Sequence, residues 1–293
     1  MTATQALPRV ESPAHPTQAW RRHWPLIAAG VLVAAPVLYG LATTVWTTEQ
    51  GAHGPIILFT GLWLLLREGT ALRPLFAPGK GWLAAILIVG GAPVLLLGHA
   101  TGWAALAVAG AYVLLIAALY LVIGGRALAR LWFPLVYLAF LIPPPQSVMA
   151  GITLALKLGI ASRAVDVMSW AGFQVALSGP DMYIDQYQLV VAAACSGMNT
   201  LVSLMAIGLF YIYLLHRSDW RYALLLAALI LPIAVAANFV RVLCLMLLMH
   251  YGGESWAEGL LHQAAGLFMF FVALGLLVGI DSLLAPLRHR LSR

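Results

Sequence analysis

Residues 189–201 read Leu-Val-Val-Ala-Ala-Ala-Cys-Ser-Gly-Met-Asn-Thr-Leu. A short apolar run of β type precedes Cys195, the Ser196-Gly197 pair is typical of a turn, and a long apolar helix is predicted from Asn199. We therefore expect the thiol of Cys195 at a junction between two elements rather than inside a membrane span. Free cysteine is usually a small buried hydrophobic residue, so this position alone does not establish a reactive thiol.

The composition of the chain indicates an integral membrane protein. Its 293 residues are 62% hydrophobic and 9% charged, whereas soluble domains contain about 25% charged residues. The apolar stretches are continuous and rich in Leu, Ala and Val, as in membrane helices of about 20 residues. They lack the alternation of apolar and polar residues that is typical of membrane β-barrels. The predicted fold class is therefore an all-α polytopic membrane protein.

The apolar runs predict about eight transmembrane helices. Their ranges are 24–46, 56–66, 82–97, 103–123, 131–142, 199–215, 222–249 and 264–284. The fifth run ends at three prolines, 143–145, which cannot continue a helix. Residues 1–22 are polar and contain prolines, so we expect a disordered cytoplasmic tail followed by one membrane domain over residues 23–293.

An insertion is predicted between the fifth and sixth spans. Apolar residues recur there at helical spacing, as in Ile152, Leu156 and Ile160, which indicates one or two amphipathic helices near the membrane interface. Residues 174–192 alternate on either side of Ser178-Gly179-Pro180-Asp181, a turn signal between two extended runs. We expect an extracytoplasmic amphipathic helix and a small hairpin that lead into Cys195.

The basic residues predict how the chain is oriented in the membrane. With a cytoplasmic N-terminus, 13 of the 16 basic residues lie in cytoplasmic segments, and Lys157, Arg163 and Arg241 are the exceptions. This asymmetry follows the positive-inside rule and places both termini in the cytoplasm. Membrane topology thus accounts for the net charge of +6, and no nucleic-acid partner is needed to explain it.

Three polar residues are predicted at one depth of the membrane. Cys195 begins the sixth span from the outer side, and His262 closes the outer loop before the last span. Arg241 is 20 residues beyond Arg221, which places it roughly 30 Å from the cytoplasmic end of its helix. Each has an ordinary alternative: Arg241 could extend to the lipid headgroups, and His262 could be an interfacial loop residue. An intramembrane arginine is nevertheless costly and points to function.

Neighbouring polar residues have expected roles of their own. Asn238, one turn before Arg241, is expected to hold the guanidinium, and Ser196 is a weaker rival nucleophile than the adjacent thiol. Cys244 lies inside an apolar run and is expected to face a packed helix. The two cysteines have no metal-type spacing, so neither a metal nor a cofactor is expected. Asp281 is expected to pair with the basic C-terminal tail.

These residues resemble the motifs of the exosortases, polytopic cysteine transpeptidases of bacteria that are related to the archaeosortases. The similar stretches are Ala194-Cys195-Ser196-Gly197, Asn238-Phe239-Val240-Arg241-Val242, His262 with Gly266, His53-Gly54 and Pro143-Pro144-Pro145. The short motifs are weak singly, but their order, spacing and shared outer depth make the combination specific. The resemblance covers roughly residues 40–285.

The resemblance implies a cysteine peptidase or transpeptidase in the bacterial inner membrane, with its active site facing the periplasm. The implied catalytic residues are Cys195, Arg241 and His262, and Ser196, Gly197, Asn238 and His53 are implied as supporting residues. The implied substrates are membrane-anchored exported proteins with a C-terminal sorting signal, consisting of a Pro-Glu-Pro-type motif, one span and a basic cytoplasmic tail. The acceptor of the acyl group is left open between an amine, a hydroxyl and water.

A non-enzymatic permease or a scaffold of polysaccharide export is the alternative function. A permease is expected to carry polar or broken-helix features near the bilayer midplane. Pro232 and the cluster of Gly90, Gly91 and Pro93 are features that keep this alternative open. The sharply polar residues are instead predicted to gather at one face of the membrane, which favours the enzyme.

Overall fold

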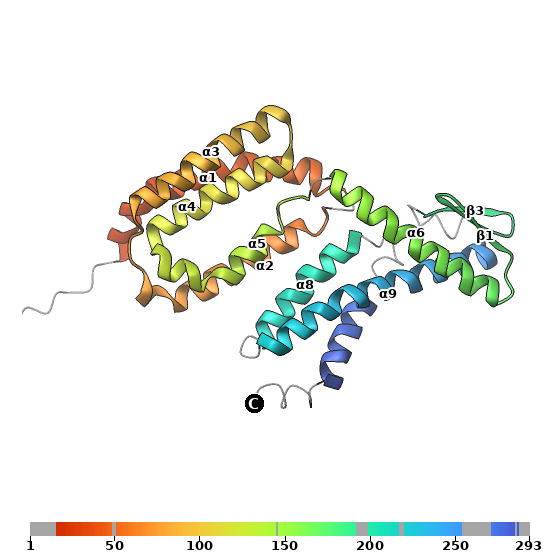
Figure 1. Cartoon of the computed structure of the whole chain (residues 1–293). Helices are drawn as coiled ribbons and strands as arrows, with labels where there is room; N and C mark the ends of the chain where they lie inside the picture. Colours follow the sequence, from red (N-terminus) through yellow and green to blue (C-terminus); the bar gives the residue numbers. More distant parts are fainter. Residues whose placement is uncertain are drawn as a thin grey trace, which may run out of the picture. The chain divides into compact units, whose positions relative to one another are not determined.

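The computed structural model describes residues 16–48, 51–144, 146–191, 199–216, 220–253, 271–284 and 286. The chain divides into two compact units, one made of Met1–Tyr39 and Leu72–Arg130, the other of Gly40–Ala71 and Leu131–Arg293. The elements in chain order are α1 (Pro16–Gly40), the π-helical η1 (Leu41–Val45), α2 (Gly54–Ala71), the 3-10 turn η2 (Arg73–Leu75), α3 (Gly81–Thr101), α4 (Ala104–Arg130), α5 (Trp132–Ala139), α6 (Gln146–Trp170), β1 (Val175–Ser178), β2 (Asp181–Ile184), β3 (Tyr187–Val190), α8 (Asn199–His216) and α9 (Trp220–Gly252) (Figure 1). A further helix, Phe271–Leu284, follows α9.

In the first unit, α3 and α4 form an antiparallel pair that packs through glycines (Figure 1). A Cβ atom at Gly98 would lie 2.2 Å from the backbone nitrogen of Ala107, and one at Gly110 would lie 2.3 Å from that of Leu95. Small residues of this kind let two membrane helices approach closely, which increases their van der Waals contact. The glycines therefore set the distance between α3 and α4.

Replacing Gly98 with alanine is expected to destabilise this helix pair by about 1–3 kcal/mol, because the added methyl group overlaps backbone that cannot move aside. Gly90 lies on the same helix and has open space around its Cβ position. Gly90→Ala is therefore the matched control and is expected to leave stability unchanged or slightly raised. Thermal unfolding of the detergent-solubilised protein compares the two variants. Equal melting temperatures would contradict this account of the packing.

Gly124 interrupts α4 near the end of the predicted fourth span. Its φ angle of +74° is one that residues with a side chain rarely adopt. A Cβ atom there would also lie 2.2 Å from the carbonyl oxygen of Ala77. The extended backbone after η2 bonds to this region, with Ala77 N–H donating to the carbonyl of Ile123 at 3.3 Å. The helix is thus kinked where the span was predicted to end, at residue 123, but α4 continues to Arg130.

In the second unit, aromatic side chains join α2, α5 and α8. The rings of Phe133 and Tyr213 stack with centroids 3.8 Å apart. The hydroxyls of Tyr137 and Thr60 are 3.0 Å apart and share a hydrogen bond. Ile57 and Tyr137 are buried in the same cluster. This packing holds α2 against α5, whose eight residues span only about 12 Å.

The insertion consists of α6 and a three-stranded antiparallel sheet. One face of α6 is buried through Ile160, Ala164 and Met168, and α6 contacts α9. The predicted turn joins β1 to β2 with Ser178 opposite Asp181. The third strand, which pairs antiparallel with β2, was not expected, since only two extended runs were predicted. The chain reaches the segment before α8 from this third strand.

Four described helices are long and apolar enough to cross a membrane: Trp24–Val45, Gly81–Thr101, Ala104–Arg130 and Trp220–Gly252. They correspond to the first, third, fourth and seventh predicted spans. The apolar helices Leu204–His216 and Phe271–Leu284 are shorter. The predicted fifth span does not form a crossing helix, because α5 ends at Ala139. The chain is therefore a multi-pass membrane protein, and the total of eight spans stays a prediction.

Candidate functional site

Arg241 and Asn238 lie on α9 and are both buried inside the second unit. Each of the two residues is only 4% exposed. Their spacing of three residues puts them on one face of the helix, one turn apart. An arginine that extended from a lipid-facing surface to the headgroups would keep its guanidinium exposed, so that alternative does not fit the observed burial. The guanidinium belongs to the protein interior.

The amide of Asn238 has free hydrogen-bonding capacity. Its Nδ2 and Oδ1 atoms are buried and have no hydrogen-bond partner among the residues that the structure describes. Buried amide groups are normally hydrogen-bonded, since leaving one unsatisfied costs about 1–3 kcal/mol. The Nδ2 donors and the Oδ1 acceptor are therefore available one helical turn from Arg241. A peptide backbone presents the complementary pair of groups.

Cys195, Ser196, Gly197 and His262 lie outside the described residues, so their predicted roles stay predictions. The described elements on either side agree with the expected junction at Cys195. The strand β3 ends at Val190, Val191 N–H donates to the carbonyl of Pro180 at 2.8 Å, and α8 begins at Asn199.

Cys244, the second cysteine, does not face a packed helix as expected. It lies on the exposed surface of α9. Of its two neighbours in the sequence, Leu243 is half-buried and Leu245 is buried. All three residues are apolar, because the apolar run covers the whole circumference of the helix. The length of an apolar run therefore did not reveal which side of α9 packs against protein.

His53 lies in the turn that precedes α2, and its carbonyl accepts a hydrogen bond from Ile57 N–H at 3.1 Å. Its Nδ1 atom is buried without a hydrogen-bond partner among the described residues. Burial lowers the pKa of its imidazole, because the charged form loses solvation. His53 makes no hydrogen bond or ion pair with Arg241 or Asn238 in the described part of the chain. Its supporting role stays a prediction.

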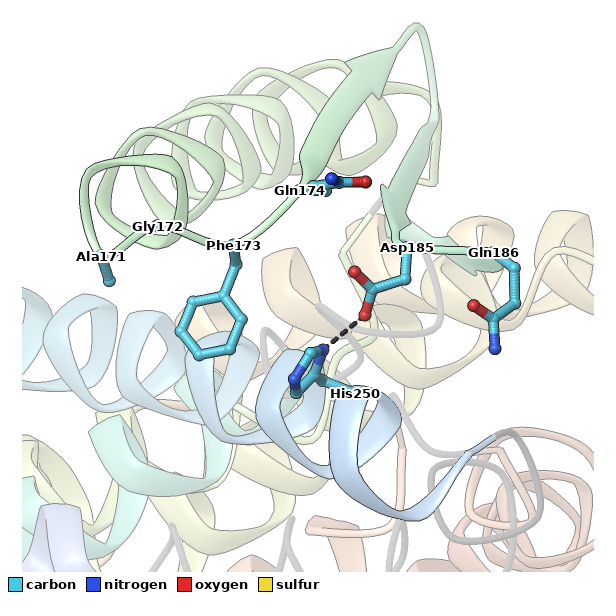
Figure 2. A pocket seen from close by; sticks show the side chains of 7 residues that line it. All are labelled: Ala171, Gly172, Phe173, Gln174, Asp185, Gln186 and His250. Carbon is cyan, nitrogen blue, oxygen red and sulfur yellow. Dashed lines mark hydrogen bonds and ion pairs between the residues drawn. The ribbon is translucent and has the colours of Figure 1, made fainter.

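A pocket beside the sheet contains a histidine and carboxylate pair that the sequence did not reveal (Figure 2). Nδ1 of His250, near the end of α9, is hydrogen-bonded to Oδ2 of Asp185, in the turn between β2 and β3. The ring of Phe173 contacts the imidazole of His250 edge to face, with the two ring centroids 4.9 Å apart. The pocket is lined by Ala171, Gly172, Phe173, Gln174, Asp185, Gln186 and His250.

This pair lies away from Arg241. His250 follows Arg241 by nine positions on α9, which places their side chains on opposite faces of a helix with 3.6 residues per turn. The pair connects the turn before β3 to the end of α9. It therefore anchors the strand that leads toward Cys195, and it does not share the face of Arg241 and Asn238.

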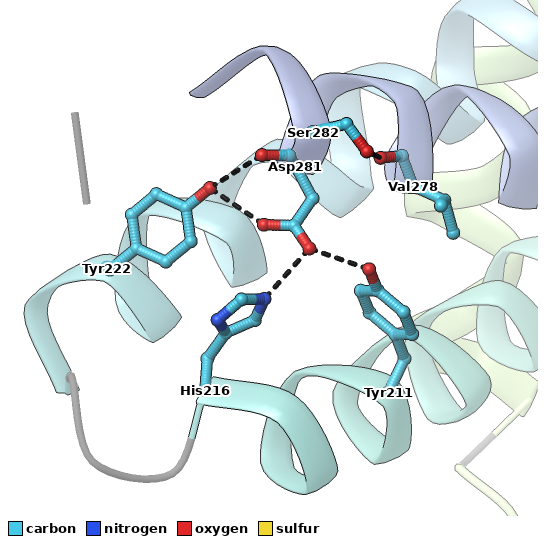
Figure 3. A network of polar contacts seen from close by, with 6 residues as sticks. All are labelled: Tyr211, His216, Tyr222, Val278, Asp281 and Ser282. Atoms are coloured by element: carbon cyan, nitrogen blue, oxygen red, sulfur yellow. Dashed lines mark hydrogen bonds and ion pairs between the residues drawn. The ribbon is translucent and has the colours of Figure 1, made fainter. Parts of the chain in front are cut away.

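A second polar cluster centres on Asp281 and joins three helices (Figure 3). Its Oδ2 atom accepts hydrogen bonds from the hydroxyl of Tyr211 at 2.6 Å and from Nε2 of His216 at 2.8 Å. The hydroxyl of Tyr222 lies 2.7 Å from Oδ1 and 3.1 Å from the backbone carbonyl of Asp281. The expected partner of Asp281, the basic C-terminal tail, lies outside the described residues. Among the described residues, its carboxylate is bonded to α8 and α9.

The Asp281 cluster gives the predicted catalytic residues a common reference. Arg241 is 19 residues after Tyr222, Cys195 is 21 residues before His216, and His262 is 19 residues before Asp281. Along α9, 19 residues correspond to about 28 Å, close to the hydrocarbon thickness of a bilayer. The shared depth of the three residues stays a prediction, because Cys195 and His262 lie outside the described residues.

Comparison with known proteins identifies a family. A family model described as transmembrane exosortase matches residues 45–279, most of the chain. The match includes all of the predicted catalytic and supporting residues. No curated protein and no solved structure matches the chain. Within the described residues, no group of three or more His, Cys, Asp and Glu side chains is arranged to hold a metal ion.

Proposed function

Because the chain belongs to the transmembrane exosortase family, a family with a role in protein sorting, we propose that it is a membrane cysteine peptidase or transpeptidase. The observation that carries this proposal is the buried Arg241 beside the unsatisfied amide of Asn238 on a membrane helix. A fixed cation and a free amide inside an apolar bundle are suited to hold a peptide and to stabilise negative charge on it. The proposed catalytic residues are Cys195, Arg241 and His262.

The proposed substrates are exported proteins that end in a sorting signal with one membrane span. A substrate span crosses the same thickness of bilayer as α9 between Tyr222 and Arg241. Basic residues that follow such a span are retained on the cytoplasmic side. The scissile bond just outside the span would then lie at the periplasmic level of Arg241, in a protein of the bacterial inner membrane with both termini in the cytoplasm.

In the first proposed step, the thiolate of Cys195 attacks the carbonyl carbon of the scissile peptide bond. The C–N bond breaks, a thioester forms on Cys195, and His262 donates a proton to the departing amine. A cysteine thiol has a pKa of about 8.5, so a neighbouring positive charge is needed to populate the thiolate at neutral pH. Arg241 donates hydrogen bonds to the oxyanion that develops on the carbonyl oxygen.

In the second proposed step, an acceptor releases the acyl group from Cys195. His262 takes a proton from the acceptor as the acceptor attacks the thioester, and the thiolate of Cys195 leaves. An amine or a hydroxyl acceptor gives a transfer product, whereas water gives hydrolysis. The amide of Asn238 is proposed to bind the backbone of the substrate next to the scissile bond.

Co-expression with a tagged candidate substrate tests the proposal. The substrate carries a Pro-Glu-Pro-type motif, one span and a basic tail, and it is expected to become shorter only when the protein is present. A substrate with the same span and a scrambled motif is the control. If the protein is produced in full amount and neither substrate is shortened in any tested pairing, the enzyme is contradicted, and a permease or scaffold of polysaccharide export is favoured.

A further inference from the structure

Three helices of the second unit meet at one buried carboxylate. Asp281 belongs to the helix Phe271–Leu284, Tyr211 and His216 belong to α8, and Tyr222 belongs to α9. The four residues approach one another from three directions (Figure 3). His216 is 4% exposed, Asp281 9% and Tyr222 fully buried. The hydrogen bonds are thus shielded from solvent, where charge-assisted hydrogen bonds are strong.

The remaining contacts between these helices are apolar and fit closely. Ala273, Leu277 and Asp281 form one buried face of the last helix. A Cβ atom at Gly208 on α8 would lie 2.8 Å from the side chain of Ile230 on α9 and 3.2 Å from that of Leu277. Apolar contacts of this kind tolerate small rotations and slides of a helix. Directional hydrogen bonds to a single carboxylate constrain these movements further, because each bond requires a specific geometry.

Each of these helices is connected to one proposed catalytic residue. Arg241 is on α9, Cys195 precedes α8, and His262 precedes the helix Phe271–Leu284. Asp281 lies a full helix length from Arg241, so a rotation at the Tyr222 end of α9 would also turn the guanidinium. The three proposed catalytic residues come from separate segments of the chain.

We propose that Asp281 is a positioning residue, which aligns α8, α9 and the last helix so that Cys195, Arg241 and His262 meet in catalytic geometry. The effect on catalysis rests on the proposed function, whereas the alignment of the three helices does not. The carboxylate of Asp281, which lies about one membrane thickness from Arg241 along α9, then affects the reaction rate without contacting the substrate. Misplacement of a reacting group by about 1 Å is enough to lower a rate by about 100-fold.

The structural arm of the test measures distances between spin labels and needs no activity. Labels are placed at Val240→Cys on α9 and Phe271→Cys on the last helix, both exposed positions, in a Cys195→Ala, Cys244→Ala background. Asp281→Asn is expected to broaden or shift the distance distribution, and Tyr222→Phe to do so less. Ser282→Ala is the matched control, because Ser282 is the next residue, is exposed and bonds only to Val278 of its own helix among its described contacts.

The catalytic arm uses the unlabelled protein and the tagged substrate. Asp281→Asn is expected to lower kcat by about 100-fold with KM changed less than about twofold, because the substrate still binds while the reacting groups are misaligned. Ser282→Ala is expected to cleave like the parent. If Asp281→Asn does not fold, Tyr222→Phe replaces it in both arms, with a smaller expected loss.

The two arms separate the inference from the proposed function. Unchanged label distances in folded Asp281→Asn protein, or changed distances with an unchanged kcat, would overturn the positioning role. A parent protein that cleaves nothing, while its label distances respond to Asp281→Asn, would contradict the proposed function and leave the alignment of the helices supported. An unchanged KM with a reduced kcat distinguishes positioning from a general loss of folded protein.

Discussion

Cys195→Ala is expected to abolish cleavage of the tagged substrate, with a loss of at least about 1,000-fold in rate, as for other removed nucleophiles. The physical reason is that no acyl intermediate can form without the sulfur, and the adjacent hydroxyl of Ser196 is an intrinsically weaker nucleophile than a thiol. The measurement is the amount of shortened substrate on a gel after co-expression, normalised to the amount of membrane-inserted protein.

Cys244→Ala is the matched control for this prediction, since it removes the other cysteine of the chain. Cys244 lies on the exposed face of α9, where its thiol contributes little to the packed interior. The control variant is therefore expected to cleave like the parent. Full cleavage by Cys195→Ala would show that the nucleophile lies elsewhere, and loss of cleavage in both variants would implicate the thiols in stability rather than catalysis.

Arg241→Lys is expected to lower the rate by about 100-fold to 1,000-fold, although the positive charge is retained. A guanidinium presents several donors in one plane, and an ammonium at the end of a flexible chain cannot hold the same two directions toward an oxyanion. Loss of one oxyanion donor is worth about 3–4 kcal/mol in comparable sites. Because this contact strengthens in the transition state, kcat is expected to fall more than KM rises.

Arg163→Lys provides the comparison for Arg241→Lys. Arg163 lies on the exposed face of α6, as expected for a solvated helix surface, and the same chemical change there is expected to have no effect on cleavage. Rates are measured over a range of substrate concentrations with equal amounts of folded protein. If Arg241→Lys protein cleaves at the rate of the parent, any positive charge at this position is sufficient and a guanidinium is not required.

Local sequence signals predicted the elements around the site well. The Gly179-Pro180 turn between β1 and β2 and the start of α8 at Asn199 follow from residues next to them in the sequence. The prediction of the fifth span was wrong, because the length of an apolar run does not give the length of a helix when the backbone is interrupted close by. The end of α5 at Ala139 shortens what the run alone predicts, whereas α4 continues past the kink at Gly124, with its positive φ angle, to Arg130.

Long-range polar contacts could not be predicted in the same way. His216 and Asp281 are 65 residues apart, and so are Asp185 and His250. Each of these residues has an ordinary interpretation by itself, as a span-end, tail-facing or interfacial residue. Only the folding of α8, α9 and the sheet brings them together, and no local pattern identifies the partner. Helix length predicted how far along α9 Arg241 lies, but it did not predict that its side chain is buried.

Trapping the acyl intermediate tests the meeting of thiol, guanidinium and imidazole most directly. The protein is mixed with tagged substrate, quenched in acid and digested, and the modified residue is located by mass spectrometry. The account predicts substrate joined to Cys195 through a thioester that hydroxylamine cleaves, with much less adduct in Arg241→Lys protein. Efficient cleavage with no adduct on Cys195, or with the substrate joined to another residue, would contradict it.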